Sequence, residues 1–197
     1  MNDATPTMPP EAREVLEFWF GTARALGSPR IEWFRKDPGF DQEIRARFGA
    51  IYDRAVRRVL EAWRASPEPM LALVIILDQF SRNLYREDPR AYAQDEHARL
   101  CAKEAVLRGD DLALLPVQRQ FLYLPFEHSE DLADQEKGVE LMRSLEEFEE
   151  TRGLTAWAEK HRDIIRRFGR FPHRNAILGR VSTPAEIDFL KRPGSSF

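Results

Sequence analysis

Residues 70–77 of the chain read MLALVIIL, and residues 78–83 continue as DQFSRN. The first eight positions contain no polar residue, so this segment has no face suited to water. Its length fits a buried strand or a buried helix, and Val74-Ile75-Ile76 favours a strand. However, the sequence contains no second segment with the period-two alternation of a strand, so a strand here would leave its backbone groups unpaired. We therefore predict a central helix that is packed on all sides.

Helix-starting and helix-ending residues lie on both sides of this segment. Pro9-Pro10 precedes an apolar segment that ends at Gly21, and Asp37-Pro38 caps a long helix whose apolar residues recur at steps of three and four from Phe40 to Trp63. The remaining predicted helices are Ala91 to Leu107 before Gly109, Pro116 to Leu124, Ser129 to Phe148, Thr155 to Phe168 before Gly169, and a last helix that begins with the capping box Thr183-Pro184-Ala185-Glu186. They predict an all-α fold of antiparallel helical hairpins in one domain, residues 1–197, with an ordered core at about residues 10–191.

The balance of residue types is that of an ordinary globular domain. Of the 197 residues, 43% are hydrophobic, and 30 Lys and Arg against 33 Asp and Glu leave a net charge of −3. The single cysteine, Cys101, forms no internal disulfide, so the chain carries no mark of an oxidising compartment. The longest apolar run has eight residues where a membrane span needs ~20, and residues 1–10 lack the features of a secretory signal. We expect a cytoplasmic protein that does not cross a membrane.

The first candidate motif, Asp78-Gln79-Phe80-Ser81-Arg82-Asn83, directly follows the central apolar segment, so its polar side chains should be partly buried. On a helix, residues four apart meet, which pairs Asp78 with Arg82 and Gln79 with Asn83. The planar Arg82 guanidinium suits a carboxylate or phosphate ligand, and Asp78 would hold it in place. Two interpretations stay open: an anion-binding group, or an internal salt bridge with Asn83 as a helix stop.

The second motif, Glu127-His128-Ser129, follows Leu124-Pro125-Phe126, where the proline bends or ends a helix. His128, with an ordinary pKa of ~6.5, could exchange protons at neutral pH, and Glu127 could fix its tautomer or supply a second carboxylate. The competing interpretation is that Glu127, Ser129 and the acidic residues after them only favour the start of the next helix, with Ser129 as its cap.

The third motif lies at His161 and in residues 168–175, FGRFPHRN. His161 shares an apolar stripe with Trp157 and should point inward, either as a buried histidine with one partner or as a site residue.

Phe171-Pro172 then forces an extended turn that projects His173 and Arg174, with Arg170 and Asn175 beside them. An anionic ligand, or an internal carboxylate such as Asp78 or Glu127, would explain why these side chains crowd one loop.

Other kinds of site lack their sequence signatures. The chain has no His-Glu-x-x-His, Gly-rich phosphate loop or Gly-x-Ser-x-Gly pattern, so we predict no metal ligands. A metal held jointly by His128, His161 and His173 would depend on the fold. Residues 127–150 are acidic and residues 160–180 basic, which fits either the solvated faces of adjacent helices or a functional basic patch. A pI near 5.9 argues against nucleic acid as a partner.

Three segments of the sequence resemble an uncharacterised bacterial and fungal family, the domain of unknown function 924. They are LDQFSRN at residues 77–83, LPFEHS at residues 124–129 and FGRFPHRN at residues 168–175. The resemblance covers roughly Pro10 to Lys191. It implies an all-helical fold similar to tetratricopeptide-repeat proteins, and it implies no activity, substrate or catalytic residue. The sequence lacks the repeat pattern of about 34 residues, so the resemblance does not imply a peptide scaffold.

These observations support one leading hypothesis and two rivals. In the leading hypothesis the three motifs converge on a pocket for a small anionic molecule, with His128 or His173 as proton carrier. Its binding residues would be Asp78, Arg82, Asn83, Glu127, His161, Arg170, Arg174 and Asn175, with Tyr85 or Tyr123 in the wall. In the first rival, a helical groove binds a peptide or protein and the motifs only hold the hairpins together. In the second, the motifs form an internal salt-bridge network. The sequence defines neither the oligomeric state nor a cofactor.

Overall fold

The computed structural model describes residues 8–22 and 28–196, and within these ranges every regular element is helical and no strand occurs. The α-helices are α1 (Pro10–Phe20), α2 (Pro38–Val56), α3 (Pro67–Ile75), α4 (Ser81–Leu84), α5 (Asp95–Arg108), α6 (Pro116–Glu127), α7 (Leu132–Arg143), α8 (Leu154–Phe168) and α9 (Pro184–Leu190). Short 3-10 turns lie between them: η1 (Ile31–Trp33), η2 (Glu61–Ala65), η4 (Pro89–Ala91), η5 (Asp110–Ala113), η6 (Glu149–Thr151) and η7 (Pro172–Arg174). The all-α prediction is confirmed.

The central segment is a helix, as predicted. Residues Met70 to Leu77 are each fully buried, because α3 packs against α1, α5 and α6. A π-helical turn, η3 (Ile76–Phe80), joins α3 directly to α4. The extra residue in a π turn changes the direction of the side chains around it, and such turns are frequent at functional sites. Asp78, the first polar residue after the apolar run, lies in the middle of this turn.

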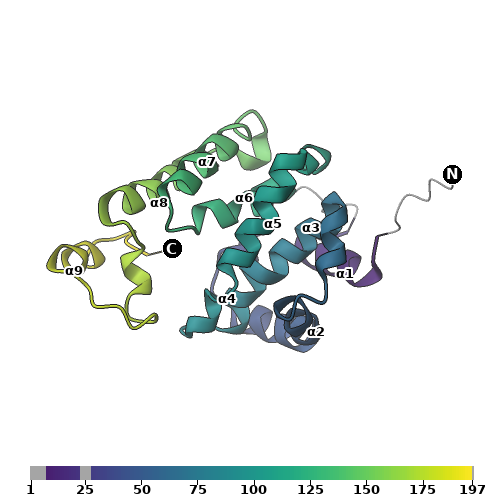
Figure 1. Ribbon diagram of the computed structural model, residues 1–197, viewed down its shortest axis with the longest axis horizontal. Coiled ribbons are helices and arrows are strands. Elements are labelled where there is room, and N and C mark those ends of the chain that lie inside the picture. Colours follow the sequence, from purple (N-terminus) through teal and green to yellow (C-terminus); the bar gives the residue numbers. More distant parts are fainter. Residues whose placement is uncertain (1–7, 23–27, 197) are drawn as a thin grey trace.

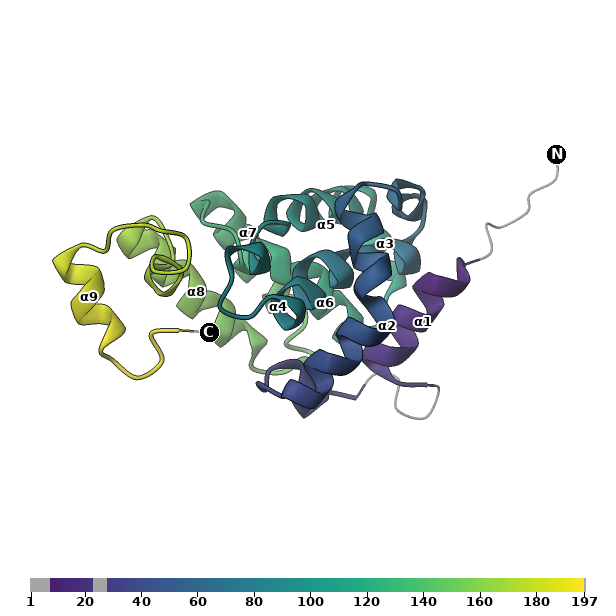
Figure 2. The ribbon, with the colours of Figure 1, turned by 90° about the horizontal axis from the view of Figure 1, so that it is seen from below.

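The helices α5 to α8 each pack against the next one along the chain (Figure 1). Beyond α8, η7 and α9 form a smaller lobe at one end of the molecule, and the chain then returns toward α4 and α8 (Figure 2). The likeness to tetratricopeptide-repeat proteins stays a prediction. Within the described ranges, no helix combines the length and the apolar character that a membrane span requires. The signal-peptide prediction rests mainly on residues 1–7, which lie outside the described residues.

Several predicted helix ends are confirmed, and others differ from the prediction, the end of α2 most of all. Asp37 accepts from the amides of Gly39 and Phe40, and Thr183 and Glu186 form the predicted capping box. However, α2 ends at Val56 and does not reach Trp63. Arg58 has a φ of 59°, and the amides of Arg58 and Val59 bond back to Ala55 and Arg54. This is a Schellman closure, which normally uses glycine at that position, so the sequence did not reveal it.

Four other boundaries also differ from prediction. Asp131, not Ser129, caps α7, because its carboxylate accepts from the amides of Ala133 and Asp134. Gly153, not Thr155, precedes α8, while the Glu146 carboxylate accepts from the Thr155 amide. The helix expected from Ala91 begins at Asp95, and that expected to end near Pro125 continues to Glu127. Pro125 lies inside α6 without an amide hydrogen to donate to the preceding turn, and the helix ends two residues later, where the His128 amide bonds to Leu124.

The turn between α6 and α7 is held by one buried side chain. The Gln135 amide nitrogen donates to the carbonyl oxygens of Glu127 at 2.6 Å and Ser129 at 2.7 Å. Because His128 lies between these two residues, Gln135 fixes the backbone that carries the histidine.

We predict that Gln135→Leu lowers the free energy of unfolding by about 1–3 kcal/mol, because two buried carbonyl groups lose their donor. Chemical denaturation followed by circular dichroism measures the change. Lys137→Ala, an exposed substitution on the same helix, is the control. Equal unfolding free energies of Gln135→Leu and Lys137→Ala would show that the two Gln135 hydrogen bonds contribute nothing to stability.

Candidate functional site

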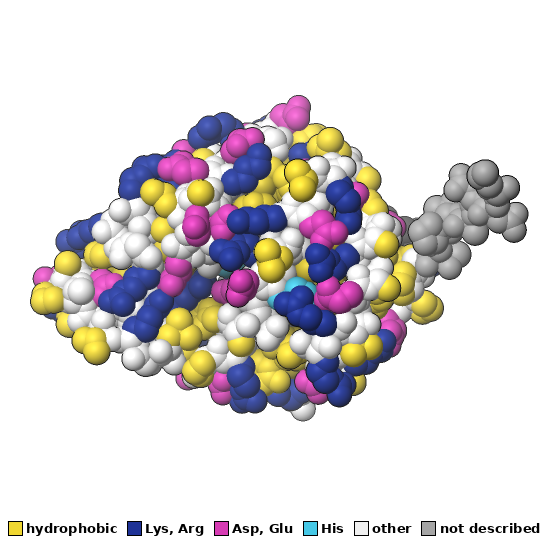
Figure 3. All heavy atoms as spheres, in the orientation of Figure 1, with side chains coloured by type: hydrophobic (Ala, Val, Ile, Leu, Met, Phe, Trp, Pro, Cys, Tyr) yellow, Lys and Arg dark blue, Asp and Glu magenta, His cyan; other side chains and the backbone are white. Residues whose placement is uncertain are grey.

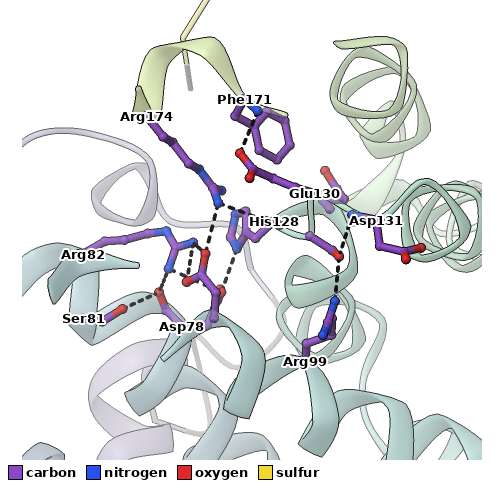
Figure 4. A network of polar contacts seen from close by, with 12 residues as sticks. Asp78, Ser81, Arg82, Arg99, His128, Glu130, Asp131, Phe171 and Arg174 are labelled. Carbon is purple, nitrogen blue, oxygen red and sulfur yellow. Dashed lines mark hydrogen bonds and ion pairs between the residues drawn. The ribbon is translucent and has the colours of Figure 1, made fainter. Parts of the chain in front are cut away.

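Asp78 is the buried centre of a polar network (Figure 4). Its side chain has no exposed surface, and its Oδ1 lies 2.7 Å from Nδ1 of His128 and 3.4 Å from the Arg82 guanidinium. The Gln79 amide donates to the other carboxylate oxygen at 2.6 Å. The predicted pairing of Asp78 with Arg82 is therefore present. The tautomer of His128 is set by Asp78 and not, as one prediction had it, by Glu127.

Burial and the charge of Asp78 act in opposite directions on the pKa of His128. Burial alone would raise the pKa of the Asp78 carboxyl, but His128 and Arg82 hold it well below its usual range. Burial lowers the pKa of His128 below its ordinary value, although Asp78 opposes the shift. At neutral pH the pair is thus a carboxylate and a neutral imidazole, with the proton on Nδ1 donated to Asp78. The lone pair of the ring is left on Nε2.

Two arginines from distant parts of the chain meet above this pair (Figure 4). Arg82 lies 3.1 Å from Asp95, and Nη1 of Arg174 lies 3.2 Å from the same carboxylate and donates to the His128 carbonyl at 3.1 Å. Both guanidinium groups lie over the ring of Tyr92, Arg174 at 4.7 Å and Arg82 at 5.6 Å from its centre. One carboxylate and one aromatic ring therefore hold the two cations side by side.

Glu127 and His161 form a second pair that is neutral. Oε2 of Glu127 lies 3.4 Å from Nδ1 of His161, and this nitrogen is also 2.9 Å from the Trp157 carbonyl. Burial, with a further contribution from Asp78, raises the pKa of Glu127 to about 8, and burial lowers the pKa of His161 to about 4. At neutral pH Glu127 therefore keeps its proton and His161 carries no charge.

His173 is also uncharged at neutral pH. Burial and the neighbouring Arg174 lower its pKa to about 3. A base this weak is a poor proton carrier at neutral pH, so of the two predicted carriers the geometry favours His128.

One cavity of about 710 Å³ is lined by Arg82, Arg174, Glu127, His128, His161 and His173. This volume is within the usual range for a small-molecule site. Its lining contains five cationic side chains, Arg35, Lys36, Arg82, Arg86 and Arg174, against two acidic ones, Glu87 and Glu127. A second hollow of about 510 Å³ shares Tyr92, His128 and Arg174 with the first. Because Glu127 is protonated at neutral pH, cationic side chains outnumber anionic ones in the lining, although Asp41, Asp78 and Asp95 outside it pair with Arg86, Arg82 and Arg174.

A family of bacterial proteins of unknown function, DUF924, matches residues 15–194 of the sequence. The chain belongs to the DUF924 family. The solved structure of a protein of unknown function from Agrobacterium tumefaciens is similar, with 42% sequence identity and a TM-score of 0.82 over 92% of this chain and 97% of that one. A search of curated proteins found no match.

Three predicted site residues of this DUF924 protein have partners elsewhere. Arg170 pairs with Glu186 at 2.6 Å and donates to the Val181 carbonyl, so it holds α9. The Asn175 amide donates to Ser182. The Asn83 amide donates to Asp41 at 2.8 Å, although Asn83 also lines the cavity. The predicted pairing of Gln79 with Asn83 is wrong, since the π turn directs Gln79 to Asp78.

Neither predicted tyrosine lies in the cavity wall. The Tyr123 hydroxyl donates to Asp111 in the core, and Tyr85 packs against Tyr52 and Arg90. Tyr92 takes the wall position instead. Sequence reasoning missed Tyr92 and Asp95 because neither stands in a motif, and an acidic residue in a first helical turn is common for dipole reasons alone.

The loop that carries Arg174 is fixed by Glu130. The Glu130 carboxylate pairs with Arg180 at 2.7 Å and accepts from the Phe171 amide at 2.8 Å, and Arg180 donates to the Phe171 carbonyl. The proline-constrained turn is thereby attached to the start of α7, and the Arg174 guanidinium, 6% exposed, is held in place.

The acidic and basic stretches of the sequence are partly explained by pairing between α7 and α8. Glu136 pairs with Arg166 at 2.5 Å, and Arg143 pairs with Glu159. On the face shown in Figure 3, basic and acidic side chains are interspersed. Of the two interpretations, the geometry favours oppositely charged faces of adjacent helices.

Metal binding has no support in the geometry. Among the residues that the structure describes, no three His, Cys, Asp or Glu side chains are arranged to hold a metal ion, and this applies to His128, His161 and His173.

We predict that, between about pH 6.5 and about pH 8, the unfolding free energy of the wild type falls by about 2 kcal/mol relative to that of Glu127→Gln. In this range the folded protein holds a proton on Glu127 that the unfolded chain has released, so folding weakens as pH rises and levels off above about pH 8. The histidines, whose pKa values are lowered in the folded protein, are partly protonated in the unfolded chain near pH 6.5 and so add an opposite slope. Wild type and variant share that slope, so the difference between them isolates Glu127. Denaturant titrations measure it, with the exposed Glu140→Gln as control. Parallel slopes for wild type and Glu127→Gln would contradict the assignment.

Proposed function

We propose that the cavity binds a small anionic molecule and that His128 acts on it as a general base. The observation that carries the proposal is the Asp78–His128 pair, 2.7 Å apart, at the inner end of a cavity that Arg82 and Arg174 also line. Asp78 itself does not line the cavity. It is a positioning residue that holds the imidazole and stabilises the charge formed when His128 takes a proton.

The binding part of the proposal is supported by the surplus of cationic side chains and by Arg174. Its Nε is buried and has no hydrogen-bond partner among the described residues, and its pKa is lowered by burial. A buried guanidinium with an unused donor is stabilised by an anion, which would complete its hydrogen bonds.

The catalytic part is supported by the opposite protonation of two adjacent residues. His128 is a neutral base with its lone pair on Nε2, and Glu127 is an acid that keeps its proton to about pH 8. A base and an acid with separated pKa values in one enclosed cavity are the requirements of general acid–base catalysis.

The alternative function, a helical module for a peptide or protein partner, is favoured by a different observation. Arg82, Arg174, Asp78 and Asp95 already neutralise one another. In that case the motifs are structural and a small anion adds little.

We predict that at least one of phosphate, sulfate and simple carboxylates raises the melting temperature. A ligand at a hundred times its dissociation constant gives about 2.7 kcal/mol, or about 5–10 °C for a chain of this size. Arg174→Ala should remain folded, because Asp95 still forms its ion pair with Arg82. Its melting temperature should no longer rise when the anion is added. Arg166→Ala removes one positive charge on the exposed side of α8 and should retain it. If no anion stabilises the wild type and Arg174→Ala unfolds, the interaction module becomes the better explanation.

We also predict that nitrogen NMR finds the His128 proton on Nδ1 and that Asp78→Asn lowers the pKa of His128 further, because the variant loses the negative charge that favours imidazolium. His97 on α5, which is buried beside Glu61, is the internal control, and its titration should not change in Asp78→Asn. An unchanged His128 titration would show that Asp78 does not govern the base.

A further inference from the structure

The cavity lining on α6, α7 and α8 changes from polar to apolar along its length, while Arg35 and Lys36 line the cavity beside Phe34. On α8 its lining residues are His161, Trp157 and Leu154, and the seven steps from His161 to Leu154 span ~10.5 Å of helix. On α6, Glu127 and His128 lie at one end, and Leu124 lies one turn further back. Met142, near the far end of α7, completes the apolar part. Glu127, His128 and His161 therefore lie at one end of this lining.

The apolar end is the open end. Trp157 is 53% exposed and Phe34 is 65% exposed, although both line the cavity. The Phe34 ring stacks at 6.1 Å on Phe121 of α6, which places the segment after η1 beside the apolar end. At the other end Glu127, His161 and Arg174 are each less than 9% exposed. Exposed aromatic side chains around a cavity mark a surface that a ligand covers.

The inner end is neutral overall and offers two hydrogen-bond donors that fit one carboxylate. Arg82 and Arg174 are balanced by Asp78 and Asp95, while Glu127 and the histidines are neutral. The unused donor of Arg174 and the proton of Glu127 can each serve one oxygen of a carboxylate. A dianion would bring two uncompensated negative charges into the inner end where a monocarboxylate brings one.

From this gradient we infer that the ligand is an amphipathic monocarboxylate, whose carboxylate lies between Arg174 and Glu127 and whose apolar chain lies along Leu124, Leu154 and Trp157. The inference rests on the proposed function, since it names the class of the anion bound by the same site.

Calorimetric titration with straight-chain carboxylates from acetate to octanoate tests the inference. We expect roughly fourfold tighter binding per added methylene, since each one buried contributes ~0.8 kcal/mol. Octyl phosphate has the same chain with a doubly charged head group, and octanol has the same chain with an uncharged one. Both should bind more weakly than octanoate. Octanoate should also shift the tryptophan fluorescence of the wild type, and Trp157→Phe should lose that shift.

Two variants separate the chain from the carboxylate. Trp157→Ala should flatten the dependence on chain length and leave acetate binding unchanged. Leu107→Ala, which removes an exposed apolar side chain on α5, should change neither. Affinity independent of chain length, or tighter binding of octyl phosphate than of octanoate, would overturn the inference while the proposed anion site stands. Failure of every anion, short or long, would instead remove the proposed function itself.

Discussion

The contact between the Asp78 carboxylate and His128 is the interaction on which the rest of the site depends. A carboxylate with no exposed surface, next to eight buried apolar residues, is very costly unless it is paired and hydrogen-bonded. Arg82 supplies one partner from the next helical turn, and His128 supplies the other from the end of α6. The requirement to compensate one buried charge therefore joins the central helix to the α6–α7 turn and orients the imidazole at the same time.

The pairing of charges continues outward from Asp78. Arg82 and Arg174 share Asp95, so the loop after α8 is attached to the first turn of α5. Glu130 and Arg180 attach the other side of that loop to the start of α7. Glu127, His161 and His173 are buried too deeply to be charged at neutral pH, and they are neutral instead. The site thus combines paired charges with buried neutral groups, and functional sites commonly perturb pKa values in this way.

The cavity lies where helices of different character meet. The end of α6 and the middle of α8 bring polar side chains to its inner end, and other turns of α6, α7 and α8 bring leucine, methionine and tryptophan to its apolar part. A site built in this way combines a strong electrostatic preference at one end with apolar contact area at the other. The polar end selects the charge of a ligand, and the apolar contact area increases the affinity of longer ligands.

The sequence by itself determined the helical class, the buried central helix, the caps at Asp37 and Thr183, and the three motifs from which most of the site is drawn. Each depends on apolar periodicity or on contacts within a few residues, which the sequence contains directly. Only the tertiary structure decided that Asp95 pairs with Arg174, 79 residues away, that Glu127 faces His161, and that Arg170 and Asn175 turn away to hold the last helix. Several carboxylates could satisfy each arginine equally well. The choice among them comes from how the helices pack and from the π turn that directs Asp78 and Gln79, and neither is encoded in local spacing.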